Sequence, residues 1–211
     1  MCLFCDILAN PHLHRNSEDT IVDISDNFYA KPALGQFIEG YTLINSKAHV
    51  PNMSYISELK KYDELQSFIE TVKKKISKYI TPNTNFVVFE HGSINKLCSE
   101  INCITACINH AHIHIVPMNV NIGEILKRNF RYEEIFKIHD LRKFKNQSYI
   151  YYEFDNAYYV FTINKSIQSQ LIRKIICEEL EINDFWNWSK YPFRENIIDF
   201  LNKYPISQRP K

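Results

Sequence analysis

Glycine is scarce in this sequence: the 211 residues include only Gly35, Gly40, Gly92 and Gly123. A phosphate-binding loop of the P-loop or dinucleotide-binding type needs several glycines at close spacing, so the sequence excludes both designs. It also lacks a run of about 18 consecutive apolar residues and a basic N-terminus followed by an apolar segment. We therefore expect a cytoplasmic protein with no membrane partner.

An excess of charge of one sign is absent as well. The chain has 25 lysines and arginines against 24 aspartates and glutamates, a formal net charge of +1. Such a balance does not imply nucleic acid as a partner, and any phosphate binding must be local. A hydrophobic fraction of 45% is enough for a proper core.

Three histidines, His110, His112 and His114, alternate in the run from Asn109 to Pro117. The β-branched residues of this run and the closing proline predict a strand, in which side chains alternate between the two faces. The three imidazoles then share one face, with about 6.5 Å from one to the next. Because each ring beside a core needs a hydrogen-bond partner, a metal or a phosphate, we interpret this row as a functional surface.

The first half of the chain has the pattern of an antiparallel sheet with one long helix. Strands are predicted at residues 20–24, 28–30, 41–44 and 85–90. Apolar residues recur at spacings of three and four from Ile56 to Ile80, which predicts a helix with Ser54 as its cap and Pro82 as its stop.

The second half is predicted to contain two short helices, an aromatic hairpin and two further helices. The short helices are expected between residues 123 and 139, the hairpin strands at 148–154 and 157–163, and the later helices from Ser166 and at 195–202. The basic residues of this half are interpreted as solvated surface; they are Lys127, Arg128, Arg131, Arg142, Lys143, Lys145 and Arg173.

Cysteine usage leaves two interpretations open. Without an export signal the six cysteines are expected to be thiols or metal ligands rather than disulfides. Cys2 and Cys5 form a C-x-x-C pair, which alone fits N-terminal thiols as well as a metal site. The other four have no ligand-like spacing and are interpreted as packing thiols; they are Cys98, Cys103, Cys107 and Cys177.

The H-x-H-x-H run followed by two apolar residues resembles the signature of the histidine triad (HIT) family of nucleotide hydrolases and transferases. Three further motifs occur in the family's order. They are the opening CLFCDI at residues 2–7, GYTLINSKAH at residues 40–49, which is similar to the family's G-H-x-L-x-x-P-K-x-H strand, and VFEHGS at residues 88–93, in the place of its substrate loop.

The resemblance covers residues 1 to about 118 and implies an α+β fold. Residues 1–118 are expected to form a HIT-like catalytic domain, an antiparallel sheet of about five strands with a long helix, often paired across the helix into a homodimer. Residues 119–211 resemble the C-terminal extension of a longer subgroup. We expect this extension to be α/β, to contain the aromatic hairpin, and to pack on the first part.

The resemblance also implies a mechanism. His112 would attack the α-phosphorus of a nucleotide and form a covalent nucleotidyl-histidine, while His114 would contact the phosphate, and His110 completes the catalytic row. The attacking nitrogen must be unprotonated, so the other ring nitrogen should donate to a fixed acceptor such as a backbone carbonyl. The expected partner is a purine nucleotide or nucleotide conjugate: a dinucleoside polyphosphate, a nucleoside phosphoramidate or another adenylylated compound. No catalytic metal is required.

A zinc-bearing branch of the family implies a ligand set of Cys2, Cys5, His49 and His110. Two cysteines and two histidines close a tetrahedral shell, so this zinc would be structural. The alternative is that the cysteines are N-terminal thiols and His49 is a surface residue.

The nucleotide contacts implied by the resemblance depart from the family pattern. Tyr41 replaces a phosphate-proximal histidine, Glu90 replaces a substrate-contacting asparagine and is expected to accept ribose hydroxyls, and His91 lies beside it. Thr105 and Cys107 stand where the family's phosphate loop has a glycine and a serine.

Two other functions remain open at this stage. The strand histidines could bind a catalytic zinc in a metallohydrolase, because H-x-H on a strand is a good metal pair. Alternatively, the altered phosphate loop and Tyr41 fit a nucleotide-binding module with little turnover.

Overall fold

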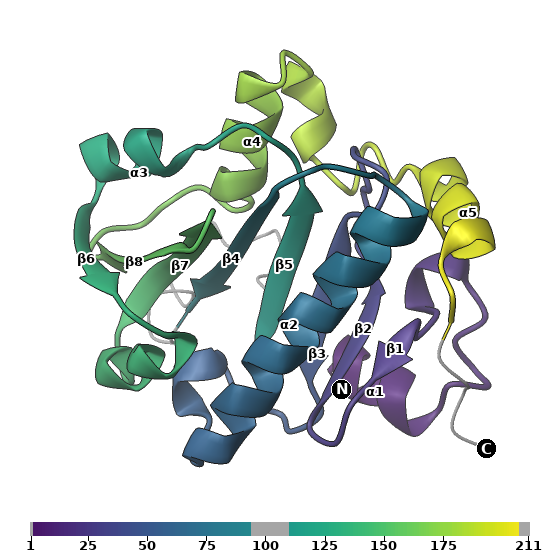
Figure 1. The fold of residues 1–211 in the computed structure, drawn as a ribbon, viewed down its shortest axis with the longest axis horizontal. Coiled ribbons are helices and arrows are strands. Elements are labelled where there is room, and N and C mark those ends of the chain that lie inside the picture. Colours follow the sequence, from purple (N-terminus) through teal and green to yellow (C-terminus); the bar gives the residue numbers. More distant parts are fainter. Residues whose placement is uncertain (1, 94–109, 207–211) are drawn as a thin grey trace.

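The computed structural model describes residues 2–93 and 110–206 (Figure 1). Within them, eight strands form one antiparallel sheet in the order β1-β2-β3-β5-β4-β7-β8-β6. The strands are β1 (Asp23–Ile24), β2 (Phe28–Pro32), β3 (Thr42–Ser46), β4 (Phe86–Gly92), β5 (His112–Pro117), β6 (Arg131–Ile135), β7 (Ser148–Phe154) and β8 (Ala157–Ile163).

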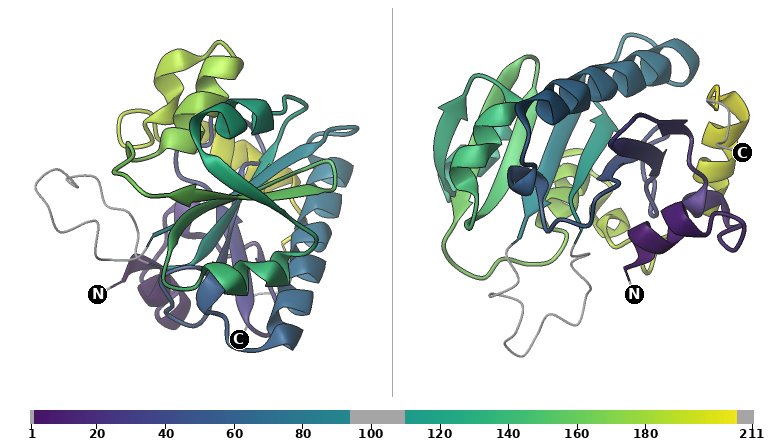
Figure 2. Two further views of the ribbon diagram at one scale, coloured as in Figure 1. Left: turned by 90° about the vertical axis from the view of Figure 1, so that its left-hand side faces the viewer. Right: turned by 90° about the horizontal axis from the view of Figure 1, so that it is seen from below.

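Helices lie on both faces and at one edge of the sheet (Figures 1 and 2). The α-helices are α1 (Leu3–Ala9), α2 (Leu59–Tyr79), α3 (Gly123–Asn129), α4 (Leu171–Glu179) and α5 (Arg194–Lys203). The 3-10 helices are η1 (Ser17–Asp19), η2 (Met53–Tyr55), η4 (Ile138–Phe144) and η5 (Asn183–Trp186). None of the helices in the described part of the chain has both the length and the apolarity of a membrane span.

The sheet separates two hydrophobic cores, and side chains of β5 point alternately to one and the other. Ile113 and Ile115 pack on the face covered by α2, which buries one apolar stripe against them. His112 and His114 point to the opposite face, where α1 and α4 pack through residues such as Phe4 and Ile172. The alternation predicted from the sequence therefore sets the histidines apart from the core under α2.

The long helix predicted from the sequence is present, but it begins at Leu59 rather than after Ser54. Ser54 lies in η2, where its hydroxyl donates to the Asn52 side chain at 2.6 Å. The side-chain oxygen of Asn52 also accepts from the Ser54 N–H and caps this short helix. Ser54 is thus part of a separate turn and does not cap α2.

Two predicted helices of the second half are wrong in extent or type. The segment predicted as a second short helix before residue 139 starts with an edge strand, β6, whose Arg131–Ile135 pairs with β8. Its side chains are exposed until Ile135, so a charged edge strand carries little apolar periodicity. The helix predicted from Ser166 begins at Leu171, after Gln170 adopts a left-handed φ of 59°.

Of the eight strands in the described residues, the expected five lie in residues 1–118, and the second half of the chain extends the same sheet with β6, β7 and β8. β7 pairs with β4 from Val88↔Glu153 to Gly92↔Tyr149, and the predicted hairpin then adds β8. The strands of residues 119–206 and those of the first part therefore share one hydrogen-bonded ladder. The boundary at residue 118 stays a prediction.

Candidate functional site

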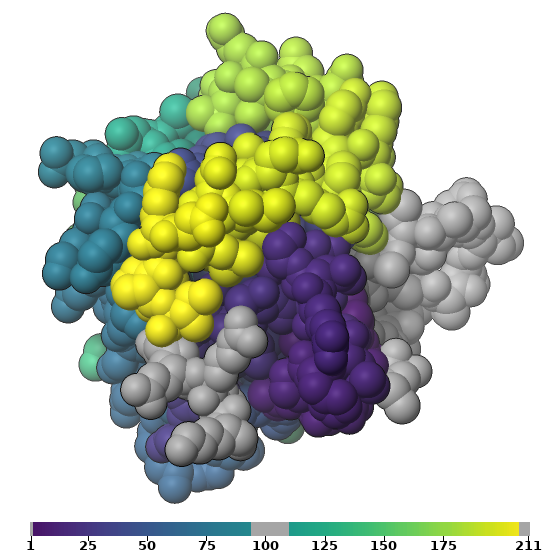
Figure 3. All heavy atoms as spheres, turned by 90° about the vertical axis from the view of Figure 1, so that its right-hand side faces the viewer, coloured from purple at the N-terminus to yellow at the C-terminus, as the bar shows by residue number. Residues whose placement is uncertain are grey.

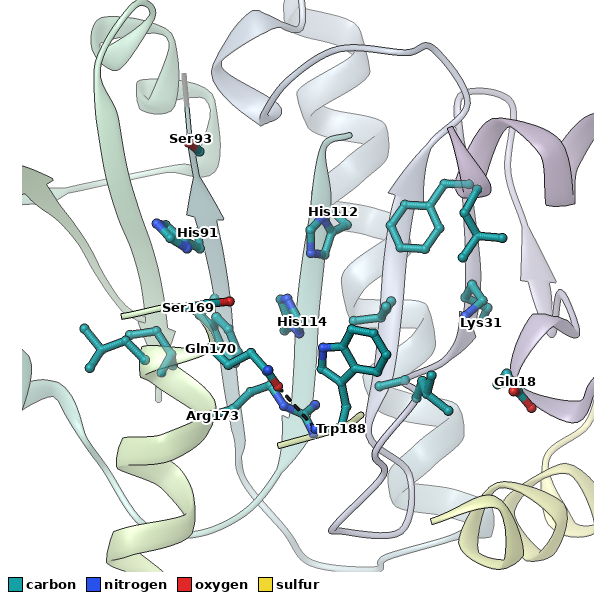
Figure 4. Close-up of a pocket in the computed structure, with 18 of the residues that line it drawn as sticks. Glu18, Lys31, His91, Ser93, His112, His114, Ser169, Gln170, Arg173 and Trp188 are labelled. Carbon is teal, nitrogen blue, oxygen red and sulfur yellow. Dashed lines mark hydrogen bonds between the residues drawn. The ribbon is translucent and has the colours of Figure 1, made fainter. Parts of the chain in front are cut away.

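A cavity of about 260 Å³ lies on the histidine face of the sheet (Figure 4). The labelled rings of His112 and His114 project into it from β5, beside His91 from β4. Its further polar lining residues are Glu18, Asp19, Lys31, Ser93, Ser169, Gln170 and Arg173, and Trp188 adds an indole. Both halves of the chain therefore build this pocket.

The backbone fixes the protonation of His112. Its Nδ1 is 2.7 Å from the carbonyl oxygen of His110, and a carbonyl can only accept, so Nδ1 carries the proton. Burial lowers the pKa of His112 to about 4, despite that hydrogen bond. The ring is therefore neutral near pH 7 and has its lone pair on Nε2.

His114 is held between two aromatic side chains. Its ring stacks on Phe89 with centroids 4.3 Å apart and an interplanar angle of 3°. Its Nδ1 is 2.7 Å from the Tyr41 hydroxyl, and burial lowers the pKa of His114 well below its usual range. Tyr41 is buried behind His114 and does not line the pocket, so its contact is with the histidine rather than with a ligand.

Cys2, Cys5, His49 and His110 come together in a second cluster, with ligand atoms all within 4.8 Å of one another. The two histidine Nδ1 atoms are 3.3 Å apart, and nitrogen–sulfur distances are 3.3 Å for Cys5 with His49 and 3.4 Å for Cys2 with His110. A tetrahedral zinc implies separations of about 3.3 Å between two nitrogens and about 3.5 Å between nitrogen and sulfur. The cluster thus has the size of a zinc shell.

The protonation of His110 also fits a ligand. Its Nε2 is 2.7 Å from the carbonyl oxygen of Ser46, so this nitrogen donates and Nδ1 faces the cluster with a lone pair. Burial and the adjacent Cys2 raise the pKa of the Cys5 thiol, so a bound cation would be needed to hold Cys5 as a thiolate near pH 7. The His110 ring is buried and does not line the pocket, so the catalytic role predicted for its side chain stays a prediction. His110 contributes its backbone carbonyl to His112.

Glu90, for which a ribose-binding role was predicted, lies outside the pocket. Successive residues of β4 face opposite sides of the sheet, so His91 lines the pocket while Glu90 is buried on the α2 side. There Glu90 accepts the Met53 N–H at 2.9 Å and the Tyr149 hydroxyl at 2.5 Å. Thr105 and Cys107 lie outside the described residues.

Sequence reasoning missed the contribution of the second half. Arg173, interpreted as solvated surface, is 5% exposed and lines the pocket with Gln170 and Trp188. Lys31, from β2, was also missed; it is buried, and desolvation lowers its pKa to about 8. Lys31 directly follows the strand predicted at residues 28–30 and had no motif of its own. Nothing in the local sequence indicates that Gln170, Arg173 and Trp188 reach a site built by residues before 118.

The described residues form an α+β protein in which an interior strand carries a histidine row, a long helix lies on the opposite face and a Cys/His cluster lies beside the row. Residues 1–131 match the family model described as "Protein similar to CwfJ C-terminal", and the chain belongs to this family. No curated protein matches the chain.

Similar solved structures include three proteins described by the histidine triad name. A HIT family protein from Bacillus anthracis is 15% identical, with 57% of this chain and 74% of that chain covered and a TM-score of 0.41. A Zn-bound histidine triad family protein from Mycobacterium smegmatis is 17% identical, with 56% and 75% covered and a TM-score of 0.38. A hypothetical histidine triad nucleotide-binding protein from Sulfolobus tokodaii is 17% identical, with 99% and 100% covered and a TM-score of 0.41.

Proposed function

We propose that this protein is a nucleotide hydrolase or nucleotidyltransferase that acts at the α-phosphate through His112. The observation that carries the proposal is the hydrogen bond from His112 Nδ1 to the His110 carbonyl, which leaves the Nε2 lone pair for the pocket. A neutral imidazole with a fixed tautomer is a suitable nucleophile toward phosphorus.

In the proposed reaction, Nε2 of His112 forms a bond to the α-phosphorus while the bond from phosphorus to the leaving group breaks. The leaving group departs with the electron pair and is protonated. Water or another acceptor then attacks phosphorus, loses a proton, and breaks the nitrogen–phosphorus bond to restore the imidazole. His114, whose ring centroid is 4.8 Å from that of His112, would contact the phosphate oxygens during both steps.

The pocket wall suits an anionic nucleotide. Lys31 and Arg173 supply buried positive charge, and Leu43, Phe89 and Ile172 supply apolar surface for a base. The candidate substrates are dinucleoside polyphosphates, nucleoside phosphoramidates and other adenylylated compounds.

We propose that Cys2, Cys5, His49 and His110 hold a structural zinc. When bound, this zinc would cross-link α1 to the segment that precedes β5 and supply no reacting group, because four protein ligands leave no open position. The catalytic-zinc alternative is not favoured, because the Nδ1 of His110 faces the cysteines outside the pocket, so the three strand histidines do not converge on one ion.

The test compares the wild-type chain with His112→Ala on adenosine phosphoramidate and diadenosine tetraphosphate. We expect His112→Ala to lower turnover by at least about 1000-fold while the unfolding midpoint is retained, since covalent catalysis is lost. Mass spectrometry after an alkaline denaturing quench should find an adenylyl group on the wild-type peptide that contains residue 112.

His139→Ala is the matched control, because this histidine lies in η4 and does not line the pocket. Turnover near the wild-type level in His112→Ala would refute the mechanism. Tight nucleotide binding by the wild type without turnover of either substrate would instead support the binding-module alternative.

A further inference from the structure

Arg173 is a buried charge without an acidic partner in the described part of the chain. It lies in the first turn of α4 and is 5% exposed. Its Nε donates to the Trp186 carbonyl at 2.9 Å and one Nη donates to the Gly35 carbonyl at 2.6 Å. Both acceptors are neutral, so the guanidinium charge is not neutralised by a carboxylate, and its position is tightly fixed.

The guanidinium lies against the phenol of Tyr41. Its Cζ is 5.1 Å from the centre of the Tyr41 ring. Burial raises the pKa of Tyr41, and the nearby charge of Arg173 opposes that effect. The phenol therefore stays protonated near pH 7, beside a buried cation.

The direction of the hydrogen bond between Tyr41 and His114 follows from this contact. The guanidinium beside the ring has donors only and cannot take the phenol proton, and among the described residues the Tyr41 hydroxyl has its hydrogen-bond contact with His114. The single phenol proton is then directed to the other neighbour, the Nδ1 of His114, 2.7 Å away. In a neutral imidazole, an accepting Nδ1 places the proton on Nε2.

We infer that Arg173 acts through Tyr41 to fix the tautomer of His114, so that its Nε2–H faces the pocket as a hydrogen-bond donor. Two neutral histidines on one strand then have opposite roles: His112 presents a lone pair and His114 presents an N–H. The ligand that fits this pair has an electrophilic phosphorus for the first ring and an acceptor oxygen for the second. The catalytic meaning of this arrangement rests on the proposed function, whereas the tautomer does not.

This inference gives the second half of the chain a role in the chemistry of the first. Arg173 belongs to α4 and Tyr41 lies just before β3, so the contact crosses the boundary predicted at residue 118. Arg173 and Tyr41 are positioning residues here, because they act through His114.

The test is a long-range proton–nitrogen NMR correlation of the histidine rings in the full chain labelled with nitrogen-15. Variant His114→Gln assigns the signals. In the wild type we expect Nε2–H at His114 and Nδ1–H at His112. Tyr41→Phe should shift His114 toward the Nδ1–H form or to a mixture of both forms, because its Nδ1 loses the donor, and it should leave His112 unchanged.

Tyr152→Phe is the matched control, since it removes a buried hydroxyl on the same face of the sheet that donates to Asn121 at 2.7 Å. It should leave both tautomers as they are. Arg173→Lys keeps the positive charge but not the planar guanidinium, and we expect part of the His114 population to change to the Nδ1–H tautomer. If this variant fails to fold, Tyr41→Phe decides the question. An Nδ1–H signal for His114 in the wild type, or an unchanged His114 in Tyr41→Phe, overturns the inference.

Kinetics separate this inference from the proposed function. Where the wild type turns over a substrate, Tyr41→Phe should lower kcat by at least about tenfold with KM within about threefold, since a donor to transition-state charge is lost. A wild type without turnover but with the Nε2–H tautomer at His114 would refute the proposed function and leave the inference supported.

Discussion

At the scale of single residues, β4 places two titratable side chains on opposite faces of the sheet. His91 faces the pocket, and burial lowers its pKa. Glu90 faces the α2 side, and burial raises its pKa to about 8, although Tyr149 and the Met53 N–H both donate to the carboxyl. Two adjacent residues of β4 therefore differ in role: His91 faces the pocket, and the buried Glu90 affects stability.

Glu90 should make the protein less stable as the pH rises. Its ordinary pKa is 4.5, so between about pH 4.5 and 8 the unfolded chain releases a proton that the folded chain keeps. Across that window the free energy of unfolding should fall by up to ~4 kcal/mol from this group. Glu90→Gln removes this component, and urea unfolding at pH 5.5 and 8.5 should show a smaller pH dependence in the variant.

Glu134→Gln serves as the control, because Glu134 is exposed on β6. It should leave the pH dependence of unfolding as in the wild type. An equal pH dependence in the wild type and Glu90→Gln would contradict the assignment of this effect to Glu90.

At the scale of elements, α1 is too short to be stable alone. A helix of seven residues is marginal in water, and α1 buries only Phe4 and Ile7. Cys2 and Cys5 add the contacts with His49 and His110. The position of α1 on the sheet therefore depends on the Cys/His cluster.

The double variant Cys2→Ser, Cys5→Ser should lose zinc. We expect about one zinc per wild-type chain by elemental analysis and a small fraction of that in the variant, with a Tm lower by several degrees, because a structural metal contributes folding free energy. Cys177→Ser, in α4 and outside the cluster, should keep the metal. Metal-free wild-type protein purified without chelator would contradict the assignment.

The hairpin turn between β7 and β8 depends on two residues with left-handed backbone. Asp155 has a φ of 48° and Asn156 a φ of 62°. Asn156→Ala should destabilise the fold by ~1 kcal/mol, and Asn156→Gly should be close to neutral, because alanine lacks asparagine's tolerance of this region. Asn202→Ala, in the helical backbone of α5, should not destabilise. Equal unfolding midpoints for the two Asn156 variants would contradict this account.

Sequence periodicity predicts those elements whose own residues determine them. The alternating histidines of β5, the β7–β8 hairpin and the apolar face of α2 each have a local sequence pattern. Each is found in the structure. No local pattern predicts where α2 begins or that residues 131–135 form a strand. The segment before α2 turns at Ser54 because of its hydrogen bond to the Asn52 side chain, and β6 forms by pairing with β8. Tertiary partners decide both.

The site shows the same division. Alternation along β5 predicts that His112 and His114 share one face, and the resemblance to the HIT family predicts that Cys2, Cys5, His49 and His110 come together; the structure has both arrangements. Arg173, Gln170 and Trp188 come from a segment separated from β5 by β6, β7 and β8, and Lys31 is one charged residue in a buried strand. No spacing rule connects them to the histidines.

At the scale of the whole molecule, the two halves of the chain are closely joined. β4 and β7 share a ladder, and the segments near the two ends lie side by side, where Arg194 of α5 donates to Glu18 at 2.8 Å (Figure 3). The helix α4 covers the histidine face. These contacts bury surface that residues 1–118 alone would expose.

We expect a fragment of residues 1–118 to be aggregation-prone. Without β7, the residues of β4 from Val88 to Gly92 become an open edge, and the apolar surface under α4 is exposed. The measurement is the soluble yield and the cooperativity of unfolding of the fragment against the full chain. Co-expression of residues 119–211 should restore solubility, and cooperative unfolding of the isolated fragment would contradict this expectation.

The short helix α1 faces two ways, and this affects how metal dependence must be interpreted. Its Phe4 ring contacts the rings of His110 and His112, with centroids 5.6 Å and 5.5 Å away, and Leu3 and Phe4 line the pocket. A chelator that removes a zinc ion from Cys2 and Cys5 would release this wall from beside His112, the proposed nucleophile. Inhibition by a chelator would then mean that the pocket has lost the wall formed by Leu3 and Phe4, even though no metal takes part in bond making or breaking.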